Sequence, residues 1–201
     1  CVVNDEPGLV WVANLASLEL HVLLGRKENV ERPSWLVFDL DPGPPAGLLQ
    51  CAEIGLAMRD MLGEMGLERF PKSSGGNGLH LYVPLNSETS FGETKSFARA
   101  VAEVLERHHG ERVTSVMKKS ARVGKVFVDW SQNDQHKTTV CVYSLRARPR
   151  PTVSAPLEWK EVERAVKRGD AGPLLIESDE MLKRVKKKGD LFENVLRMKQ
   201  K

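Results

Sequence analysis

The stretch WLVFDLDPGPP, residues 35–45, decides the fold, because an apolar run of strand length ends in two aspartates and a proline-rich turn. Residues two apart in a strand share a face, so Asp39 and Asp41 project to one side and Leu40 to the other. Burying carboxylates is costly unless positive charge meets them. The stretch is therefore a metal site, a salt-bridged strand end or a solvated loop.

A second apolar stretch, KVFVDW at residues 125–130, carries one more acid, Asp129, near its end. If the two stretches form neighbouring strands, three carboxylates converge and could hold two cations about 4 Å apart. Aspartate oxygens are hard ligands that suit Mg²⁺ or Mn²⁺. The alternative is that Asp129 only caps a turn together with Ser131 and Asn133.

A glycine-rich loop, KSSGGNG at residues 72–78, leads into the predicted strand LHLYVPL. Successive glycines let backbone N–H groups point inward and form an anion-binding nest. His80 shares a strand face with Tyr82 and could donate a hydrogen bond to a triphosphate. The loop is not a P-loop, because Lys72 precedes the glycines, and a flexible surface hairpin is the alternative.

An arginine-rich stretch, YSLRARPRP at residues 143–151, follows another apolar segment. Arg146 lies at the end of that segment, where a guanidinium suits bidentate phosphate recognition. Arg148 and Arg150 are expected to be solvated neighbours in a proline-rich turn.

Composition is that of an ordinary globular protein, with 201 residues, 41% hydrophobic and 28% charged. The net charge of +3 hides an asymmetry, because residues 112–150 hold nine basic and two acidic side chains. Such a block indicates either a polyanion-binding surface or a solvated charged face. No apolar run has membrane-spanning length, no signal peptide is visible, and three scattered cysteines suit a reducing cytosol.

Hydrophobic periodicity predicts a mixed α/β fold, a sheet flanked by helices. Helices are expected at 8–25, 47–65, 91–109 and 157–168, strands at 35–41, 79–85, 125–130 and 138–145, and a short helix with a fraying tail at the lysine-rich end. His21 is expected to be a hydrogen-bonded core histidine of the first helix. Cys1 in place of Met indicates a trimmed chain.

Four motifs together resemble one family. DLDPG, SGGNGLHLYVPL, KVFVDWSQN and YSLRARP, in this order, are similar to the polymerase domain of bacterial ligase D and its stand-alone relatives, in the archaeo-eukaryotic primase superfamily. The resemblance runs from Val10 to about Trp159 and implies a primase-polymerase catalytic half with an RRM-like palm. Residues 1–160 are expected to be the catalytic part, and 161–201 the helical, basic end of the same domain.

The resemblance also implies an activity and a set of site residues. Such domains are template-dependent nucleotidyltransferases of non-homologous end joining that add ribonucleotides, or less readily deoxyribonucleotides, at DNA ends with two Mn²⁺ or Mg²⁺ ions. The metal-binding, catalytic acids would be Asp39, Asp41 and Asp129. The nucleotide-binding residues would be Ser74, Gly75, Gly76, Asn77, His80, Arg122, Gln132 and Arg146.

This chain departs from the family pattern in two ways. Family members usually have a lysine where this chain has Asn77. Either a lower nucleotide affinity or compensation by a neighbour such as Lys72 is expected. The family also carries about a hundred further residues before the first helix seen here. Those residues grip the 5′-phosphate of the DNA end, which puts the activity of this chain in isolation in doubt.

The expected partners follow from the same resemblance. They are an NTP or dNTP, DNA with 5′-phosphorylated ends or gaps, an end-joining ligase and a Ku-type end-binding protein. A monomer in the bacterial or archaeal cytoplasm, associated with the nucleoid and not with a membrane, is expected.

Two other classes of protein remain open at this point. Haloacid dehalogenase-type phosphatases also begin with an apolar strand and D-x-D, and would use Asp39 as a nucleophile. In this chain, however, Pro42 intervenes before the glycine of that motif. The other alternative is a DNA-end-binding module without catalysis, which would gain no divalent-cation site from the three aspartates.

Overall fold

The computed structural model describes residues 2–85 and 87–200, so Cys1 lies outside the described part. A five-stranded sheet in the order β5-β6-β4-β8-β7 forms its centre. Its strands are β4 (Trp35–Pro42), β5 (Phe70–Ser73), β6 (Leu79–Pro84), β7 (Val113–Thr114) and β8 (Val126–Asp129). β4 pairs antiparallel with β6 on one edge and with β8 on the other, so the two acid-bearing strands are neighbours.

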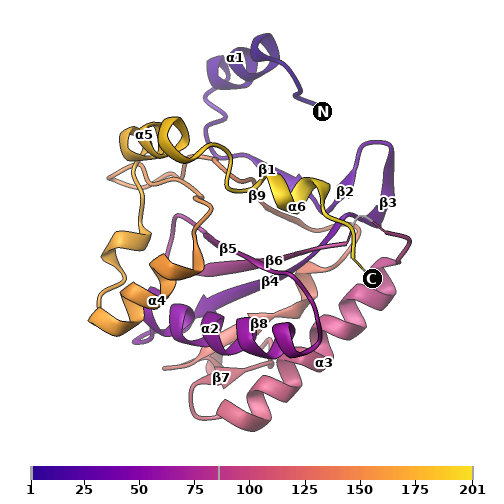
Figure 1. The fold of residues 1–201 in the computed structure, drawn as a ribbon, viewed down its shortest axis with the longest axis vertical. Helices are drawn as coiled ribbons and strands as arrows, with labels where there is room; N and C mark the ends of the chain where they lie inside the picture. Colours follow the sequence, from indigo (N-terminus) through magenta and orange to yellow (C-terminus); the bar gives the residue numbers. More distant parts are fainter. Residues whose placement is uncertain (1, 86, 201) are drawn as a thin grey trace.

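Alternation along β4 separates the two faces of the sheet. Phe38 and Leu40 belong to the main apolar core, whereas Val37 packs in a smaller cluster on the opposite face. The main core contains residues of α2 (Leu48–Glu64), α3 (Phe91–His109) and α4 (Trp159–Arg168). Figure 1 shows α2 and α3 below the sheet and α6 (Glu193–Arg197) above it. Asp39 and Asp41 therefore point to the less covered face.

Local signals explain where the two long helices begin and end. Ser90 and Glu93 form a capping box at the start of α3, with the Ser90 hydroxyl accepting from the Glu93 N–H at 3.2 Å. Gly66 follows α2 with a φ of +75°, the left-handed conformation that glycine adopts most readily after a helix. The predicted helices at 47–65 and 91–109 are thereby confirmed.

The prediction of one helix over residues 8–25 is wrong. Helix α1 covers only Glu6–Asn14 and buries none of its residues. The chain then turns, with Ala16 at a φ of 57°, and His21–Leu23 forms β1, which pairs antiparallel with β9 (Thr138–Val140). Pairing with β9 overrides the apolar pattern there, and a hairpin of β2 (Gly25–Arg26) and β3 (Asn29–Pro33) follows.

Two other boundaries also differ from the predictions. The strand expected over 138–145 stops at Val140, because the backbone turns sharply at Tyr143, whose φ is 65°. The carboxy-terminal end carries two helices, α5 (Ser178–Lys188) and α6, instead of one short helix and a tail. Short 3-10 helices occur at η1 (Lys119–Ala121), η2 (Trp130–Gln132) and η3 (Gly172–Leu174).

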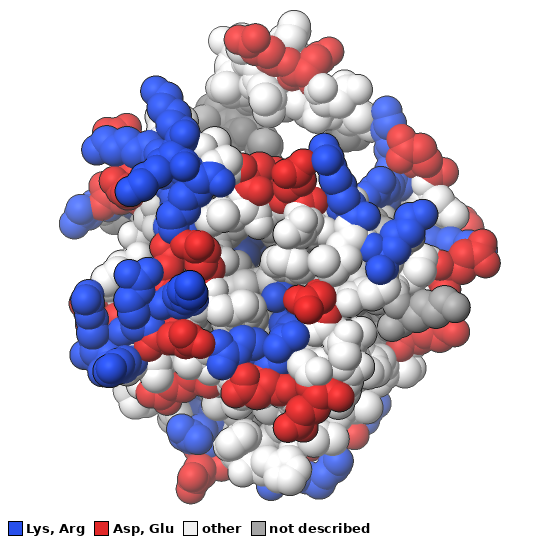
Figure 2. Space-filling model, in the orientation of Figure 1, with Lys and Arg blue, Asp and Glu red and all other residues white. Residues whose placement is uncertain are grey.

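Charged side chains are unevenly spread over the surface. Lysine and arginine gather over α4 and α5, on the left of Figure 2, where carboxylates lie between them. Arg184 and Glu161 form one such ion pair. Across residues 2–85 and 87–200, no helix has both the length and the apolar character needed to cross a bilayer.

Candidate active site

The register of the sheet brings three chain segments to one point. Asp39 on β4 lies directly opposite Asp129 on β8 and, on its other side, directly opposite His80 on β6. Opposed residues of antiparallel strands have Cα atoms roughly 4.5–5.5 Å apart. The convergence of Asp129 with the Asp39–Asp41 pair, which the sequence predicts only if the strands are neighbours, is therefore present.

Asp39 and His80 form a buried pair beneath the surface of the site. His80 Nε2 lies 3.2 Å from Asp39 Oδ1, and the Thr139 hydroxyl lies 3.5 Å from His80 Nδ1. Burial, together with the nearby charge of Lys72, lowers the pKa of His80, so the ring is neutral. Burial by itself would raise the pKa of Asp39, but the interaction with His80, followed by the charges of Lys72 and Arg146, outweighs this and lowers it.

Asp41 has the opposite electrostatic character. Burial, followed by the charges of Asp39 and Asp129, raises the pKa of Asp41 to about 6. Arg122 Nη1 lies 4.0 Å from Asp41 Oδ2 and only partly offsets this effect. The three carboxylates therefore repel one another, and a cation among them would relieve the repulsion.

Asp129 is held in place by its own strand end. Its Oδ1 accepts hydrogen bonds from the Ser131 N–H at 2.9 Å and from the Ser131 hydroxyl at 2.5 Å. Lys137 Nζ donates to the same hydroxyl oxygen at 2.6 Å. The alternative role, capping of the turn, is thus also seen, and it orients the Asp129 carboxylate without removing it from the acid cluster.

The acid cluster suits a hard divalent cation, since its donors are aspartate oxygens. Among the residues that the structure describes, no three His, Cys, Asp or Glu side chains are already arranged as a metal-binding group. Asp39 and Asp41 also have partners of their own, His80 and Arg122. The donor set fits a metal ion, and its side chains would have to reorient to hold one.

The glycine-rich loop packs tightly against the arginine-rich stretch. The Ser74 hydroxyl oxygen accepts from the N–H groups of Gly76 at 3.1 Å and Gly78 at 3.2 Å. Gly75 has a φ of +70°, and a Cβ there would lie 2.6 Å from Arg146 Cγ. Only glycine fits this position. The loop is therefore a structured turn organised by Ser74, and not a free hairpin.

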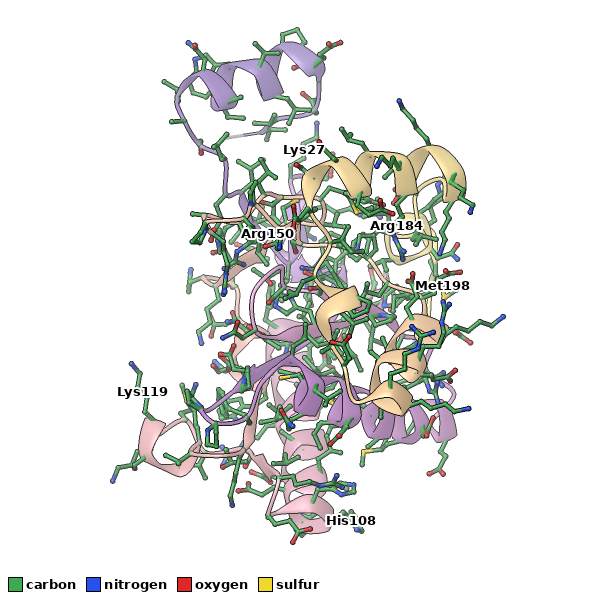
Figure 3. The ribbon with its side chains drawn as sticks, turned by 90° about the vertical axis from the view of Figure 1, so that its left-hand side faces the viewer. Lys27, His108, Lys119, Arg150, Arg184 and Met198 are labelled. Carbon is green, nitrogen blue, oxygen red and sulfur yellow. The ribbon has the colours of Figure 1, made fainter. Side chains whose placement is uncertain are left out.

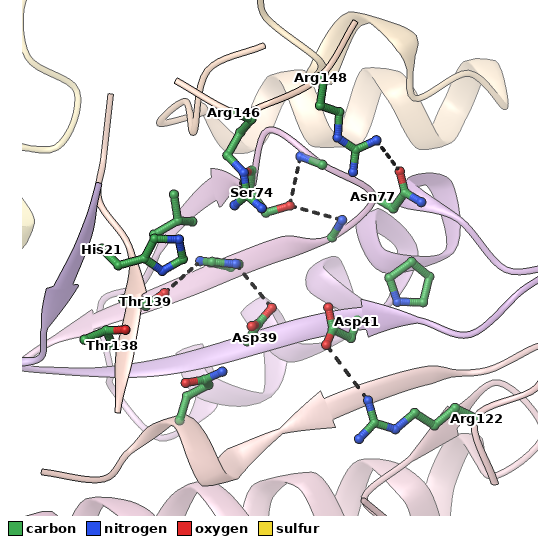
Figure 4. Close-up of a pocket in the computed structure, with 16 residues that line it drawn as sticks. His21, Asp39, Asp41, Ser74, Asn77, Arg122, Thr138, Thr139, Arg146 and Arg148 are labelled. Atoms are coloured by element: carbon green, nitrogen blue, oxygen red, sulfur yellow. Dashed lines mark hydrogen bonds and ion pairs between the residues drawn. The ribbon is translucent and has the colours of Figure 1, made fainter. Parts of the chain in front are cut away.

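Two arginines border this loop. Arg146 Nη1 donates to the Ser74 carbonyl oxygen at 3.2 Å, and Arg148 Nη1 donates to Asn77 Oδ1 at 3.3 Å (Figure 4). Arg148, which the sequence suggested was a solvated neighbour, thus lies at the loop. The basic side chains of residues 112–150 therefore lie in different places. Arg146 and Arg148 border the loop, whereas Lys119 on η1 points away from the body of the molecule in Figure 3.

Lys72 does not compensate for Asn77 in the expected way. The Lys72 side chain is fully buried, and its Nζ donates to the Ser154 hydroxyl at 2.5 Å and to the Val140 carbonyl at 3.3 Å. Burial lowers the pKa of Lys72 to about 7. The side chain cannot reach a phosphate at the loop surface, so Arg148 is the cation in contact with Asn77.

These segments enclose a cavity of about 440 Å³, within the usual size range of small-ligand sites. Its walls include most of the predicted site residues: Asp39, Asp41, Ser74, Gly76, Asn77, His80, Arg122, Gln132 and Arg146. Gly75 and Asp129 do not line it, although Gly75 lies in the loop and Asp129 lies beside Asp39.

The cavity also has walls that the sequence did not indicate. They are His21, Pro42, Gly78, Thr138, Thr139, Val140 and Arg148. His21, expected in the core of a helix, is instead an exposed residue of β1, and its ring faces the cavity. The available signal was the E-L-H spacing, which puts Glu19 and His21 on one side of an extended segment.

Comparison with known proteins identifies relatives over nearly the whole chain. A model of the LigD primase-polymerase domain matches residues 1–192. The multifunctional non-homologous end joining DNA repair protein LigD of Mycobacterium tuberculosis is 43% identical over 202 residues, which cover 96% of this chain and 26% of that protein. The bifunctional LigD of Bacillus subtilis is 32% identical over 192 residues, covering 95% of this chain and 30% of that protein.

A solved structure has the same fold. The polymerase domain of Mycobacterium tuberculosis ligase D in complex with DNA superposes with a TM-score of 0.83 at 42% identity, covering 96% of this chain and 68% of that one. The chain thus spans about a quarter of the length of the mycobacterial relative, and about two thirds of the solved domain.

Proposed function

The chain belongs to the LigD primase-polymerase family, whose members are metal-dependent nucleotidyltransferases, and from this membership and the site geometry we propose that it extends DNA ends by template-directed nucleotide addition. One observation carries the proposal. Asp39, which lies opposite Asp129 in the sheet, lines the same cavity as the serine-organised glycine loop and Arg146. Acids for cations and donors for phosphates therefore lie on facing walls of one cavity.

We assign the acidic wall to metal binding. Asp39, Asp41 and Asp129 would hold two ions, Mn²⁺ or Mg²⁺, which would supply charge neutralisation of the phosphates and activation of the attacking hydroxyl. Neutral His80 keeps Asp39 oriented through its Nε2 proton. The raised pKa of Asp41 means that this carboxyl gives up a proton when it becomes a ligand below pH 6.

We assign the opposite wall to the triphosphate of the incoming nucleotide. Arg146 and Arg148 supply guanidinium groups, and the loop from Ser74 to Gly78 supplies backbone and hydroxyl donors. Arg122 and Gln132 complete the wall near the acids. These groups position the nucleotide and neutralise its charge, which is the main contribution a protein makes to phosphoryl transfer.

The partners are proposed on the same basis. The mycobacterial structure contains DNA, and the relatives are named for non-homologous end joining. We propose 5′-phosphorylated ends or gaps in DNA as the substrate, ribonucleotides in preference to deoxyribonucleotides, and a ligase and a Ku-type protein as partners in the nucleoid. Residues 1–160 would form the catalytic part and 161–201 the helical end of one domain.

The family match disfavours a haloacid dehalogenase-type reaction through a nucleophilic Asp39. A binding module without catalysis is separated by experiment. The test is extension of a gapped, 5′-phosphorylated DNA with Mn²⁺ and labelled ribo- or deoxyribonucleotides, using the protein and its Asp129→Ala variant. We expect incorporation that Asp129→Ala abolishes. Equal incorporation by that variant would refute the metal assignment, and DNA binding without incorporation by the unmodified protein would support a binding module.

A further inference from the structure

Glu19 contacts two cavity-lining side chains without lining the cavity itself. It lies at a bend in the segment between α1 and β1, and its Oε1 lies 3.1 Å from His21 Nε2. Its Oε2 forms an ion pair with Arg146 Nε at 3.2 Å and accepts a hydrogen bond from the Ala147 N–H at 3.1 Å. One carboxylate therefore joins the β1 segment to the arginine-rich stretch, which lies more than a hundred residues later in the chain.

The Glu19 carboxylate is ionised where these contacts form. Hydrogen bonds from His21 and Ala147, aided by the charge of Arg146, lower its pKa. Both of its oxygens have partners, and its side chain is 31% exposed. The Glu19 carboxylate therefore bridges His21 and Arg146.

Arg146 is restrained at two points that leave part of its guanidinium available. Its Nε lies 3.2 Å from Glu19 Oε2 as a charge pair without hydrogen-bond geometry, and its Nη1 donates to the Ser74 carbonyl oxygen. A guanidinium carries five N–H donors, so others remain for an anion in the cavity. His21 has few other restraints, since β1 is only three residues long and pairs with the equally short β9.

We propose that Glu19 is a positioning residue that fixes Arg146 and His21 at the phosphate-binding wall before the nucleotide arrives. The inference rests on the proposed function and deepens it. A long side chain that is already held in its binding rotamer loses less entropy when the ligand binds. The Glu19 charge itself opposes anion binding. Glu19 lies on the Nε side of Arg146, however, away from the terminal Nη donors. We therefore expect the restraint on the Arg146 side chain to affect anion binding more than the Glu19 charge does.

The test compares Glu19→Ala and Glu19→Gln with the unmodified protein in nucleotide incorporation and in equilibrium binding of inorganic tripolyphosphate. We expect Glu19→Ala to raise the KM for nucleotide and the Kd for tripolyphosphate about tenfold, with kcat and DNA affinity changed less than twofold. Glu19→Gln retains an acceptor oxygen and should recover part of the loss. A merely structural role would raise the KM and the Kd and would also lower kcat, DNA affinity and the unfolding midpoint.

A double-mutant cycle with Arg146→Ala identifies the path of the effect. In the Arg146→Ala background, Glu19→Ala should raise the KM for nucleotide and the Kd for tripolyphosphate less than twofold further, because the side chain that Glu19 positions is gone. Glu103→Gln, which breaks a surface ion pair of Arg99 on α3, is the matched control and should change nothing. Unchanged or tighter tripolyphosphate binding by Glu19→Ala, or full additivity in the cycle, would overturn the inference. Failure of the unmodified protein to incorporate nucleotide would instead overturn the proposed function, since the tripolyphosphate measurement does not depend on catalysis.

Discussion

Replacing Asp41 by asparagine should stabilise the metal-free protein at neutral and alkaline pH. Asp41 is pushed toward its protonated form by burial and by the charges of Asp39 and Asp129. Asparagine is nearly isosteric with aspartate and carries no charge. The substitution therefore removes the repulsion between residue 41 and the carboxylates of Asp39 and Asp129. The variant should have a higher free energy of unfolding although it has lost a functional carboxylate.

The magnitude follows from the pKa of this carboxyl. A rise from 3.8 to about 6 corresponds to roughly 3 kcal/mol, at about 1.4 kcal/mol per unit. The Asp41 side chain is 52% exposed, so solvent screening reduces the expected gain to about 1 kcal/mol. Because the folded state holds this proton more tightly than the unfolded chain, the stability that protonated Asp41 provides is complete below pH 4. It is lost as the pH rises through about 6.

Urea denaturation in the presence of EDTA, at pH 4.5 and pH 8, measures this difference. The free energy of unfolding of Asp41→Asn should exceed that of the unmodified protein by about 1 kcal/mol at pH 8 and by much less at pH 4.5. Added Mn²⁺ should reverse the order at pH 8, because the variant lacks one ligand and gains less from the ion. A variant that is less stable in EDTA at pH 8, or that gains equally from Mn²⁺, would refute the idea that these carboxylates form one cation site.

Three further substitutions test separate parts of the site. Ser131→Ala removes the hydroxyl that orients Asp129, and should lower kcat about tenfold with little change in the KM for nucleotide. Steady-state extension assays measure both quantities, and an unchanged kcat would contradict this prediction. Arg146→Ala should weaken nucleotide binding about tenfold and DNA binding less than twofold, which equilibrium titrations compare, and equal losses would contradict it. Asn133→Ala should cost about 2–4 kcal/mol of unfolding free energy in urea, because the Val37 N–H and carbonyl lose their buried partner; a loss below about 0.5 kcal/mol would contradict it.

The central strands and their acids were predictable because local periodicity and tertiary structure agree there. In β4, apolar residues alternate between two buried faces until the aspartates begin, and the observed strand ends at Pro42 as the turn residues predict. Nothing local shows that β8 is the neighbour of β4, however. The sequence therefore left Asp129 as either a metal ligand or a turn cap, and only the register resolves where it lies.

The first segment was not predictable in the same way. Residues 8–25 have the apolar content of a buried helix, yet α1 buries nothing and His21 belongs to a strand. The strand exists because β9, more than a hundred residues away, offers hydrogen-bonding groups to that stretch. Single-sequence periodicity carries no information on such a partner. The residues that this strand brings to the cavity, His21 and the adjoining Glu19, were missed for the same reason.

Burial gives two aspartates on one strand face different chemistry. Asp39 has His80 and the buried ammonium of Lys72 nearby, so its pKa is lowered and it is ionised before any cation binds. Burial and the two like charges of Asp39 and Asp129 raise the pKa of Asp41 to about 6, and Arg122 at 4.0 Å offsets this only in part. Cation binding should therefore release a proton from Asp41, but not from Asp39, when the pH is below 6. The letters D-x-D are symmetric. The asymmetry comes mainly from His80, which pairs with Asp39 and not with Asp41, and Lys72 adds a smaller effect from within the sheet and not from the loop above it.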